Sequence, residues 1–229
     1  MDDGYFQQFA SLFNEFDVPA AFWVNIQLTF FAGILALVLG TVLATMRISP
    51  VPSLRWAGST YVTLLRNTPL TIIIVFCVLG LWGQLGVKLS PDFETNFFRL
   101  AVLGLAVYHA AFVCEALRSG VNTVPVGQSE AARAIGLSFW PAARLIILPQ
   151  AFRGSVAPLG NVLIALTKNS TVAAAGSVAE ASGLMSTMIE FRPDVILAIF
   201  LTFALGFVVI VVPIGLATTS LSRRLAVAR

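Results

Sequence analysis

Charged side chains are scarce in this sequence of 229 residues, and their scarcity limits what the protein can be. Asp, Glu, Lys and Arg make up 11% of the chain, whereas soluble domains contain about 25%. Hydrophobic residues make up 58%, and the mean hydropathy is +0.89. A soluble domain of this size has too little interior for so many apolar side chains. The composition therefore excludes an ordinary soluble enzyme, a nucleic-acid-binding protein and a disordered protein, despite the net charge of +3.

Residues that carry enzymatic chemistry are also few. His109 is the single histidine and cannot build a metal site by itself, while Cys77 and Cys114 lie in apolar runs typical of inert thiols. The chain lacks a GxxxxGK[ST] phosphate loop and any Ser/His/Asp or Cys/His arrangement. We therefore expect no catalytic residues, no metal site and no cofactor bound by this chain. The acidic start, with Asp2 and Asp3, is not typical of a cleaved signal peptide.

Long apolar runs dominate the chain instead. A helix needs about 20 mainly apolar residues to cross the hydrocarbon core of a membrane. Five segments qualify, at about 22–46, 61–82, 97–117, 155–175 and 195–221. Helices are expected because an open strand leaves backbone polar groups unpaired in lipid. The sequence thus predicts an all-α integral membrane protein with five transmembrane helices in one domain, residues 22–221.

Charges of opposite sign are distributed unequally over the connecting segments. One set of segments is rich in arginine: Arg47, Arg55, Arg118, Arg133, Arg144, Arg153, Arg223, Arg224 and Arg229, with only Glu115 and Glu130 as acids. The other set is mainly acidic: Asp2, Asp3, Glu15, Asp17, Asp92, Glu94, Glu180, Glu190 and Asp194, against Lys88, Arg99 and Arg192. The positive-inside rule then predicts an external N-terminus and an internal C-terminus, with residues 222–229 as a basic cytoplasmic tail.

Apolar residues before the first span share one face of a helix. They recur at i, i+3 and i+4 spacing as Tyr5, Phe6, Phe9, Leu12, Phe13 and Phe16. Residues 1–21 are therefore expected to form an external amphipathic segment at the membrane interface. The pattern leaves open whether this segment lies flat on the outer surface or packs against neighbouring spans.

The connection between the third and fourth spans, residues 118–154, is far longer than a plain connector. Alanine-rich residues 128–135 predict a short helix that Gly136 ends, because glycine adopts the left-handed conformation at little cost. Ser138 is expected to cap a second helix, with a proline in its first turn, that reaches Pro149. The spacing alone leaves two alternatives open, a docking element for a partner protein and a hairpin against the protein's own spans.

This loop resembles the EAA signature of ABC importer permeases. Every position of the signature is matched, by Glu130-Ala131-Ala132, Gly136, Ile146 and Leu148-Pro149. The resemblance implies that the loop is a cytoplasmic coupling element that contacts an ATP-binding subunit. The residues expected to serve this coupling are Gly127, Glu130, Ala131, Ala132, Arg133, Gly136, Leu148 and Pro149.

The chain is also similar to the polar amino-acid uptake branch of that family over about residues 20–220. The matching segments are residues 61–70, which contain Arg66-Asn67-Thr68-Pro69, and residues 110–138 and 148–171. The chain departs from the usual pattern at Asn67, at Ser119 and at Asn169-Ser170-Thr171. Among members of the branch, it most resembles one permease half of actinobacterial systems for an acidic amino acid, glutamate.

This resemblance implies several partners in the cytoplasmic membrane of a bacterium. They are two ATP-binding subunits that hold ATP and Mg, a second permease subunit and an external amino-acid-binding protein, with lipid around the spans. The second permease subunit is either identical to this chain or related to it. The implied function is a permease that couples closure of the ATPases to alternating access, without catalysis of its own.

Polar residues inside predicted spans mark a candidate path for the substrate. Lys168 lies in or near the fourth span, where a charge is costly and by default faces protein or water. It either meets a substrate carboxylate or snorkels to the interface and pairs with an acid. The candidate path residues are Lys168, Asn169, Ser170, Thr171, Tyr108, His109 and Phe112, although helix packing explains the last three equally well.

A second candidate group lies at the inner end of the third span. Glu115 and Arg118 are three residues apart and so share one helix face. They are expected to form a structural ion pair or a gate. Arg66, near the cytoplasmic end of the second span, either anchors to lipid headgroups or pairs with Glu115.

A self-sufficient membrane protein is the alternative class. An ATP-independent secondary transporter often contains an internal repeat with paired broken helices. The sequence shows no convincing repeat and no paired acids for ion coupling, so this alternative and a channel are less favoured. A scaffold that merely recruits an ATPase needs no polar residues in its spans. The presence of Lys168 and Glu115 in predicted spans therefore argues against a scaffold.

Overall fold

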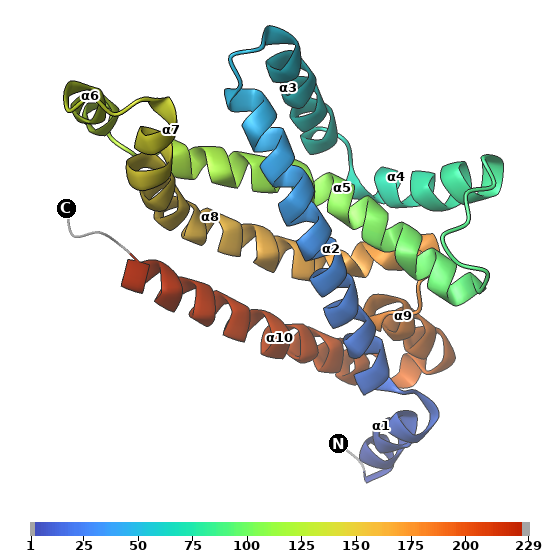
Figure 1. Cartoon of the computed structure of the whole chain (residues 1–229). Coiled ribbons are helices and arrows are strands. Elements are labelled where there is room, and N and C mark those ends of the chain that lie inside the picture. Colours follow the sequence, from blue (N-terminus) through green and yellow to red (C-terminus); the bar gives the residue numbers. More distant parts are fainter. Residues whose placement is uncertain (1–2, 226–229) are drawn as a thin grey trace.

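The computed structural model describes residues 3–225, apart from the side chains of residues 3–8 and 139–140. Every regular element in this described range is a helix. Figure 1 shows long helices that cross one another, with α1 at one end of the molecule and α6 at the other. The α-helices are α1 (Asp3–Glu15), α2 (Val18–Ile48), α3 (Pro52–Arg66), α4 (Leu70–Val75), α5 (Phe93–Asn122), α6 (Val126–Ala134), α7 (Phe139–Ala142), α8 (Leu148–Asn169), α9 (Ala181–Phe191) and α10 (Ile196–Leu225).

Three of these helices are long and apolar enough to cross a membrane by themselves. They are α2, α5 and α10, at the places of the first, third and fifth predicted spans. Asp17 caps α2 by accepting a hydrogen bond from the Ala20 N–H at 2.9 Å, and Asp92 caps α5 in the same way with the Thr95 N–H at 2.8 Å. Two bent helix pairs raise the number of candidate spans to five.

The second predicted span is not the single helix expected for residues 61–82. Its two arms, Pro52–Arg66 and Leu70–Gln84, meet at 104°, and the second arm is π-helical over Phe76–Gln84. Pro69 causes the break, because proline disfavours helical geometry in the preceding residue and has no N–H to donate. The Thr68 hydroxyl donates to the Leu64 carbonyl at 2.8 Å and so satisfies one of the carbonyls that end α3. Apolar content alone does not reveal such a bend.

The fourth span also differs from the prediction of residues 155–175. Helix α8 already begins at Leu148, continues as a 3-10 helical segment over Ser170–Gly176, and bends by 58° into α9. The early start follows from packing: the Ser155 hydroxyl and the Ala151 carbonyl lie where a side chain at Gly120 of α5 would stand. This close contact between the two backbones keeps the polar first turns of α8 helical.

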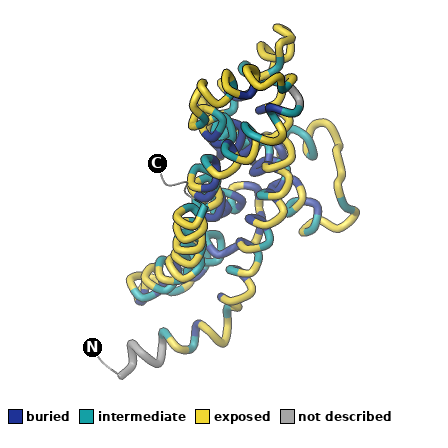
Figure 2. The backbone as a smooth tube through the Cα atoms, turned by 60° about the vertical axis from the view of Figure 1, so that its left-hand side comes forward, coloured by how far each residue is buried: buried dark blue, intermediate teal, exposed yellow. Residues whose placement is uncertain are grey.

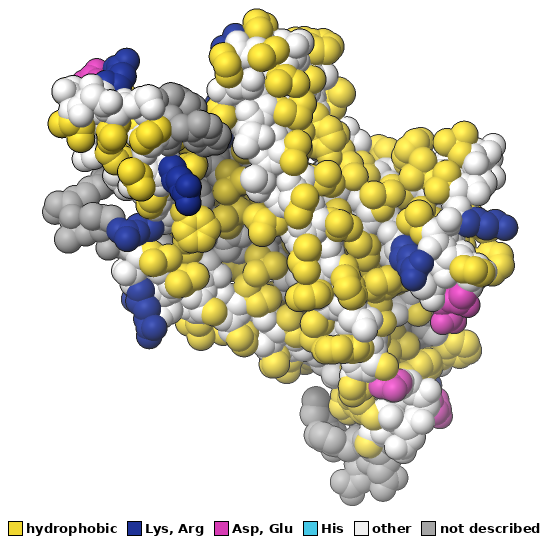
Figure 3. Space-filling view, in the orientation of Figure 1, with side chains coloured by type: hydrophobic (Ala, Val, Ile, Leu, Met, Phe, Trp, Pro, Cys, Tyr) yellow, Lys and Arg dark blue, Asp and Glu magenta, His cyan; other side chains and the backbone are white. Residues whose placement is uncertain are grey.

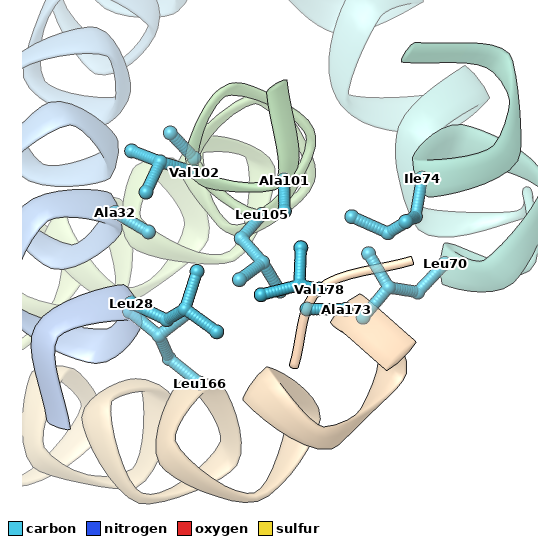
Figure 4. Packing of buried hydrophobic residues seen from close by; sticks show 11 residues of the cluster. Leu28, Ala32, Leu70, Ile74, Ala101, Val102, Leu105, Leu166, Ala173 and Val178 are labelled. Carbon is cyan, nitrogen blue, oxygen red and sulfur yellow. The ribbon is translucent and has the colours of Figure 1, made fainter. Parts of the chain in front are cut away.

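Small and branched apolar residues fill the space where α2, α5 and α8 cross. Leu28, Ala32, Leu105 and Leu166 are buried in one cluster, which also takes in Ile74 of α4. Figure 4 shows these side chains pointing toward one another, and they come from α2, α4, α5 and α8. Close helix approach without a strong hydrophobic driving force is typical of membrane proteins, and small residues at the crossings permit it.

Helix α1 packs against the rest of the protein. Leu12 is fully buried, and Phe9 and Phe16 lie beside it against a cluster from α9, α10 and the start of α2. These contacts fit the anchored alternative for the N-terminal segment. Of the other expected face residues, Phe13 is 42% exposed, and the side chains of Tyr5 and Phe6 lie outside the described part.

The outer surface is apolar along most of its length. Buried residues gather where the helices cross, and exposed residues follow the outward turns (Figure 2). Leu205, Val209 and Leu216 of α10 are each more than 60% exposed. Figure 3 shows hydrophobic side chains over the middle of the molecule and charged ones toward its ends. Such a surface is suited to lipid or to another membrane subunit.

Candidate transport path and coupling surface

Helix α6 projects from the rest of the molecule at one end (Figure 1). Gly136 ends it with a φ of +84°, and the Leu137 N–H donates to the Ala132 carbonyl at 3.0 Å. This is the glycine-terminated helix that the sequence predicts. Ala132 faces inward with 1% exposure, whereas the other coupling candidates of this segment are exposed: Gly127, Glu130, Ala131, Arg133 and Gly136.

The second predicted helix of the loop ends differently from expectation. Helix α7 begins directly after Ser138, as predicted, and passes through a π-helical segment, Ala143–Ile147, into α8. Pro149 therefore lies in the first turn of α8, directly after the π-helical segment, rather than at the end of a separate helix. Leu148 and Pro149 are both exposed. The expected loop of residues 118–154 shortens to residues 123–147, because α5 and α8 extend into it.

His109 connects α5 to the end of α8. Its ring is 1% exposed, with Nδ1 at 2.9 Å from the Leu105 carbonyl oxygen and Nε2 at 3.2 Å from Asn169 Nδ2. A neutral ring satisfies both contacts, because Nδ1–H donates to the carbonyl and Nε2 accepts from the Asn169 amide. The sequence names both residues as path candidates, and the fold brings them together from two helices.

Aromatic rings continue this contact along α5. The Tyr108 and Phe112 rings lie 5.0 Å apart, and the His109 and Phe112 rings 6.1 Å. The Arg66 guanidinium of α3 lies 5.7 Å from the centre of the Phe112 ring, within the range of a cation–π contact. The polar and aromatic candidates of α5 therefore form one connected row with Asn169 at one end and Arg66 at the other.

Glu115 lies next in this row, accepts a hydrogen bond from Arg47, and forms ion pairs with three arginines. Its Oε1 contacts Arg47 and lies 3.8 Å from Arg66 Nη1, and its Oε2 lies 3.6 Å from Arg118 Nη1. The sequence named Arg66 and Arg118 as partners but counted Arg47 only among the cytoplasmic charges. The position of Arg47 in the last turn of α2, at the same predicted depth as Glu115, is the signal that indicates the pair.

Lys168 is exposed on the surface of this single chain. It forms no ion pair with a carboxylate of the described residues. Thr171 donates through its hydroxyl to the Lys168 carbonyl at 2.8 Å and is half-buried. Ser170, by contrast, is fully buried and faces the inside of the fold.

Ser170 belongs to a buried polar group that the sequence did not reveal. The Asn25 amide of α2 donates to Ser170 Oγ at 2.8 Å and to Glu180 Oε2 at 2.7 Å, and its oxygen accepts from the Ala181 N–H at 2.9 Å. Glu180 is fully buried and caps α9 by accepting from the Ser182 and Gly183 N–H groups. The charge pattern had placed Glu180 among the external acids. One local pattern could have indicated the role of Glu180: it lies four residues after a glycine, where an acidic side chain can cap the helix that follows.

A family comparison decides what kind of protein carries these features. Residues 36–227 match the model of the family described as binding-protein-dependent transport system inner membrane component. The chain belongs to this family. It is thus a membrane permease subunit of the ABC transporter type, and in this family the ATPase is a separate partner subunit. The ATP and Mg of such systems act on that partner.

Individual relatives of this permease have names that report amino-acid transport. The glutamate transport system permease protein GluC of Corynebacterium glutamicum is 49% identical over 212 residues, which cover 90% of this chain and 93% of GluC. GluC of Corynebacterium efficiens has the same identity and coverage. The probable glutamine ABC transporter permease protein GlnM of Bacillus subtilis is 34% identical, over 86% of this chain and 89% of its own length.

A solved structure shares the fold over nearly the whole permease. The crystal structure of an amino acid ABC transporter with histidines superposes with a TM-score of 0.84 at 25% identity. The match covers 94% of this chain and 98% of that one. An amino-acid ABC transporter therefore has the same overall fold as this chain.

Proposed function

We propose that this permease is the membrane subunit of an ATP-driven importer for an acidic amino acid such as glutamate. The substrate class is supported by the two relatives at 49% identity that are named glutamate transport permeases. It is also supported by the chemistry of the path candidates, because Arg66 lies at one end of the row and Lys168 directly precedes Asn169, which lies at the other end. Cationic side chains suit an anionic substrate.

The exposure of helix α6 is the observation that best supports a role in coupling to the ATPase. Val126 and Ile135 at its two ends are 72% and 75% exposed, and no atom lies within 4 Å of where a side chain at Gly127 would stand. The exposed apolar residues at the two ends of the helix, together with the exposed Glu130 and Arg133 between them, form a small mixed surface of apolar and charged side chains. This is the composition of a protein–protein contact. We propose that the ATP-binding subunit covers this surface.

The proposed topology has five spans, in which each bent pair crosses the membrane once. The N-terminus and residues 1–21 lie outside, α6 and α7 lie in the cytoplasm, and residues 222–229 form a basic cytoplasmic tail. Residues 22–221 form the single transmembrane domain. The grouping of arginines at the α6 end supports this orientation. Residues 226–229 of the tail lie outside the described residues.

We propose that the substrate passes along the row that joins Lys168 and Asn169 to Arg66. Five spans enclose little space by themselves, so the second wall of the path comes from a second permease subunit, identical or related. Closure of two ATPases, each holding ATP and Mg, then moves the two permeases as rigid bodies between outward-open and inward-open states. An external binding protein delivers the amino acid.

Affinity purification of this permease from its native membrane in mild detergent tests the proposal. We expect an ATPase to co-purify, and reconstituted complexes to take up glutamate only with ATP and the binding protein. Gly136→Ala strains a left-handed position and is expected to lower uptake per ATP hydrolysed. Matched Gly33→Ala, inside α2 with its nearest neighbour atom at an ordinary 3.5 Å, is the control. Uptake by this chain without any ATPase would favour the secondary transporter instead.

A further inference from the structure

The ion cluster at the inner end of α5 contains more positive than negative charge. One carboxylate, Glu115, is shared by three arginines from three helices, α2, α3 and α5. These four groups together carry a formal charge of +2. Arg66 and Arg118 keep 48% and 34% of their side chains exposed, so the excess positive charge of the cluster is accessible to a second anion.

Arg66 is the arginine that is held least tightly. Its contact to Glu115 is the longest of the three at 3.8 Å, and its side chain is 48% exposed, against 34% for Arg118 and 15% for Arg47. If Arg66 turns away, Glu115 keeps two cationic partners and does not become a buried unpaired charge. Exchange of Arg66 between Glu115 and another acceptor therefore leaves no other charge unpaired.

The guanidinium of Arg66 lies against the Phe112 ring, so its positive charge is close to the proposed path. Its guanidinium lies over the Phe112 ring, and Phe112 is in ring contact with His109, which contacts Asn169 beside Lys168. Arg66 is also the last residue of α3, directly before the 104° bend. A change at that bend would move the guanidinium relative to Glu115 without moving α5.

We propose that Arg66 is a carboxylate-binding residue at the inner end of the path, which exchanges Glu115 for a carboxylate of the anionic amino acid before release. This inference rests on the proposed function and names a second binding position besides Lys168. The planar guanidinium can hold a carboxylate through two parallel hydrogen bonds. Competition from Glu115 for the same guanidinium keeps the substrate from binding too tightly to leave.

Binding of radiolabelled L-glutamate to the complete transporter in nanodiscs tests this role. The assay omits ATP and the binding protein, so that only the permease path binds the label. Arg66→Gln is expected to weaken glutamate affinity by at least about tenfold, or about 1.4 kcal/mol. Arg66→Lys keeps the charge but loses the paired hydrogen bonds and is expected to restore part of the affinity.

Arg55→Gln is the matched control, because Arg55 is an exposed arginine on the same helix and outside the cluster. We expect it to bind glutamate as the wild type does. Glutamate affinity of Arg66→Gln equal to that of the control would overturn the inference, as would equal loss in Arg66→Gln and Arg66→Lys. Each variant is first shown to be monodisperse and assembled with its ATPase, so that misfolding is not counted as lost binding.

The same preparation separates this inference from the function on which it rests. If the wild-type transporter shows no ATP-driven glutamate uptake, the proposed function is wrong. If uptake is present and Arg66→Gln binds and releases glutamate normally, only the role of Arg66 is wrong.

Discussion

Removal of the Asn25 side chain tests how the bent fourth span is held in place. This amide connects α2 with both sides of the bend, through Ser170 before it and through Glu180 and Ala181 after it. All three hydrogen bonds are buried. Asn25→Ala removes them without adding bulk, so the protein must leave these groups unpaired or change the bend.

The expected loss follows from the number of bonds and the groups left behind. Hydrogen bonds are worth about 1 kcal/mol each in soluble proteins and about 0.6 kcal/mol in membrane proteins, so three give about 2–3 kcal/mol. The buried Ala181 N–H is left without a partner, which costs a further 1–3 kcal/mol or so. Glu180 keeps its bonds to the Ser182 and Gly183 N–H groups. We expect Asn25→Ala to lower the free energy of unfolding by about 3–6 kcal/mol.

Unfolding by SDS in mixed detergent micelles, followed by tryptophan fluorescence, measures this difference. The matched control is Asn161→Ala, which removes the same side chain from an exposed position of α8. A loss for Asn25→Ala below about 1 kcal/mol, the value of a single hydrogen bond, would refute the reasoning. So would equal losses in the two variants, since Asn161 takes no part in the buried polar group.

Three further substitutions test other parts of the structure. Gly120→Ala is expected to destabilise the protein by about 1–3 kcal/mol, because the added methyl group overlaps Ser155. Gly33→Ala, whose added methyl group meets only ordinary contacts, is the control, and thermal unfolding compares the two variants. Pro69→Ala is expected to lower ATP-driven uptake several-fold at unchanged expression, because a helix can then continue across the bend; wild-type uptake would contradict this. Lys168→Gln is expected to lower glutamate uptake strongly while the complex still assembles, and uptake equal to wild type would exclude a substrate role.

The long spans and the glycine-terminated helix of the loop could be predicted because their signals are local. An apolar run of sufficient length has few alternatives to a membrane helix, and α2, α5 and α10 confirm three such runs. The end of helix α6 at Gly136 could be predicted for a similar reason, since a left-handed position after an alanine-rich helix favours glycine. The match of residues 36–227 confirms the family to which the EAA residues pointed.

The bends were not predictable in the same way. Hydropathy averages over about 20 residues, so a proline or a short 3-10 segment inside an apolar run leaves the average almost unchanged. Residues 61–82 therefore read as one span, although Pro69 turns the helix by 104°. The start of α8 at Leu148 likewise depends on contact with α5 rather than on its own composition.

Sequence alone determined that this protein is helical, apolar on its outside and has a short glycine-terminated helix in the loop between its third and fourth spans, because these properties depend on composition and on neighbours a few residues apart. Only the tertiary structure decided which polar groups from distant parts of the chain meet. Asn25 and Glu180 are 155 positions apart, and Arg47 and Glu115 are 68 positions apart. No spacing rule connects such pairs, since their contact depends on how the helices cross. Buried polar groups in a membrane must find partners, and the packing of the helices determines which partners are within reach.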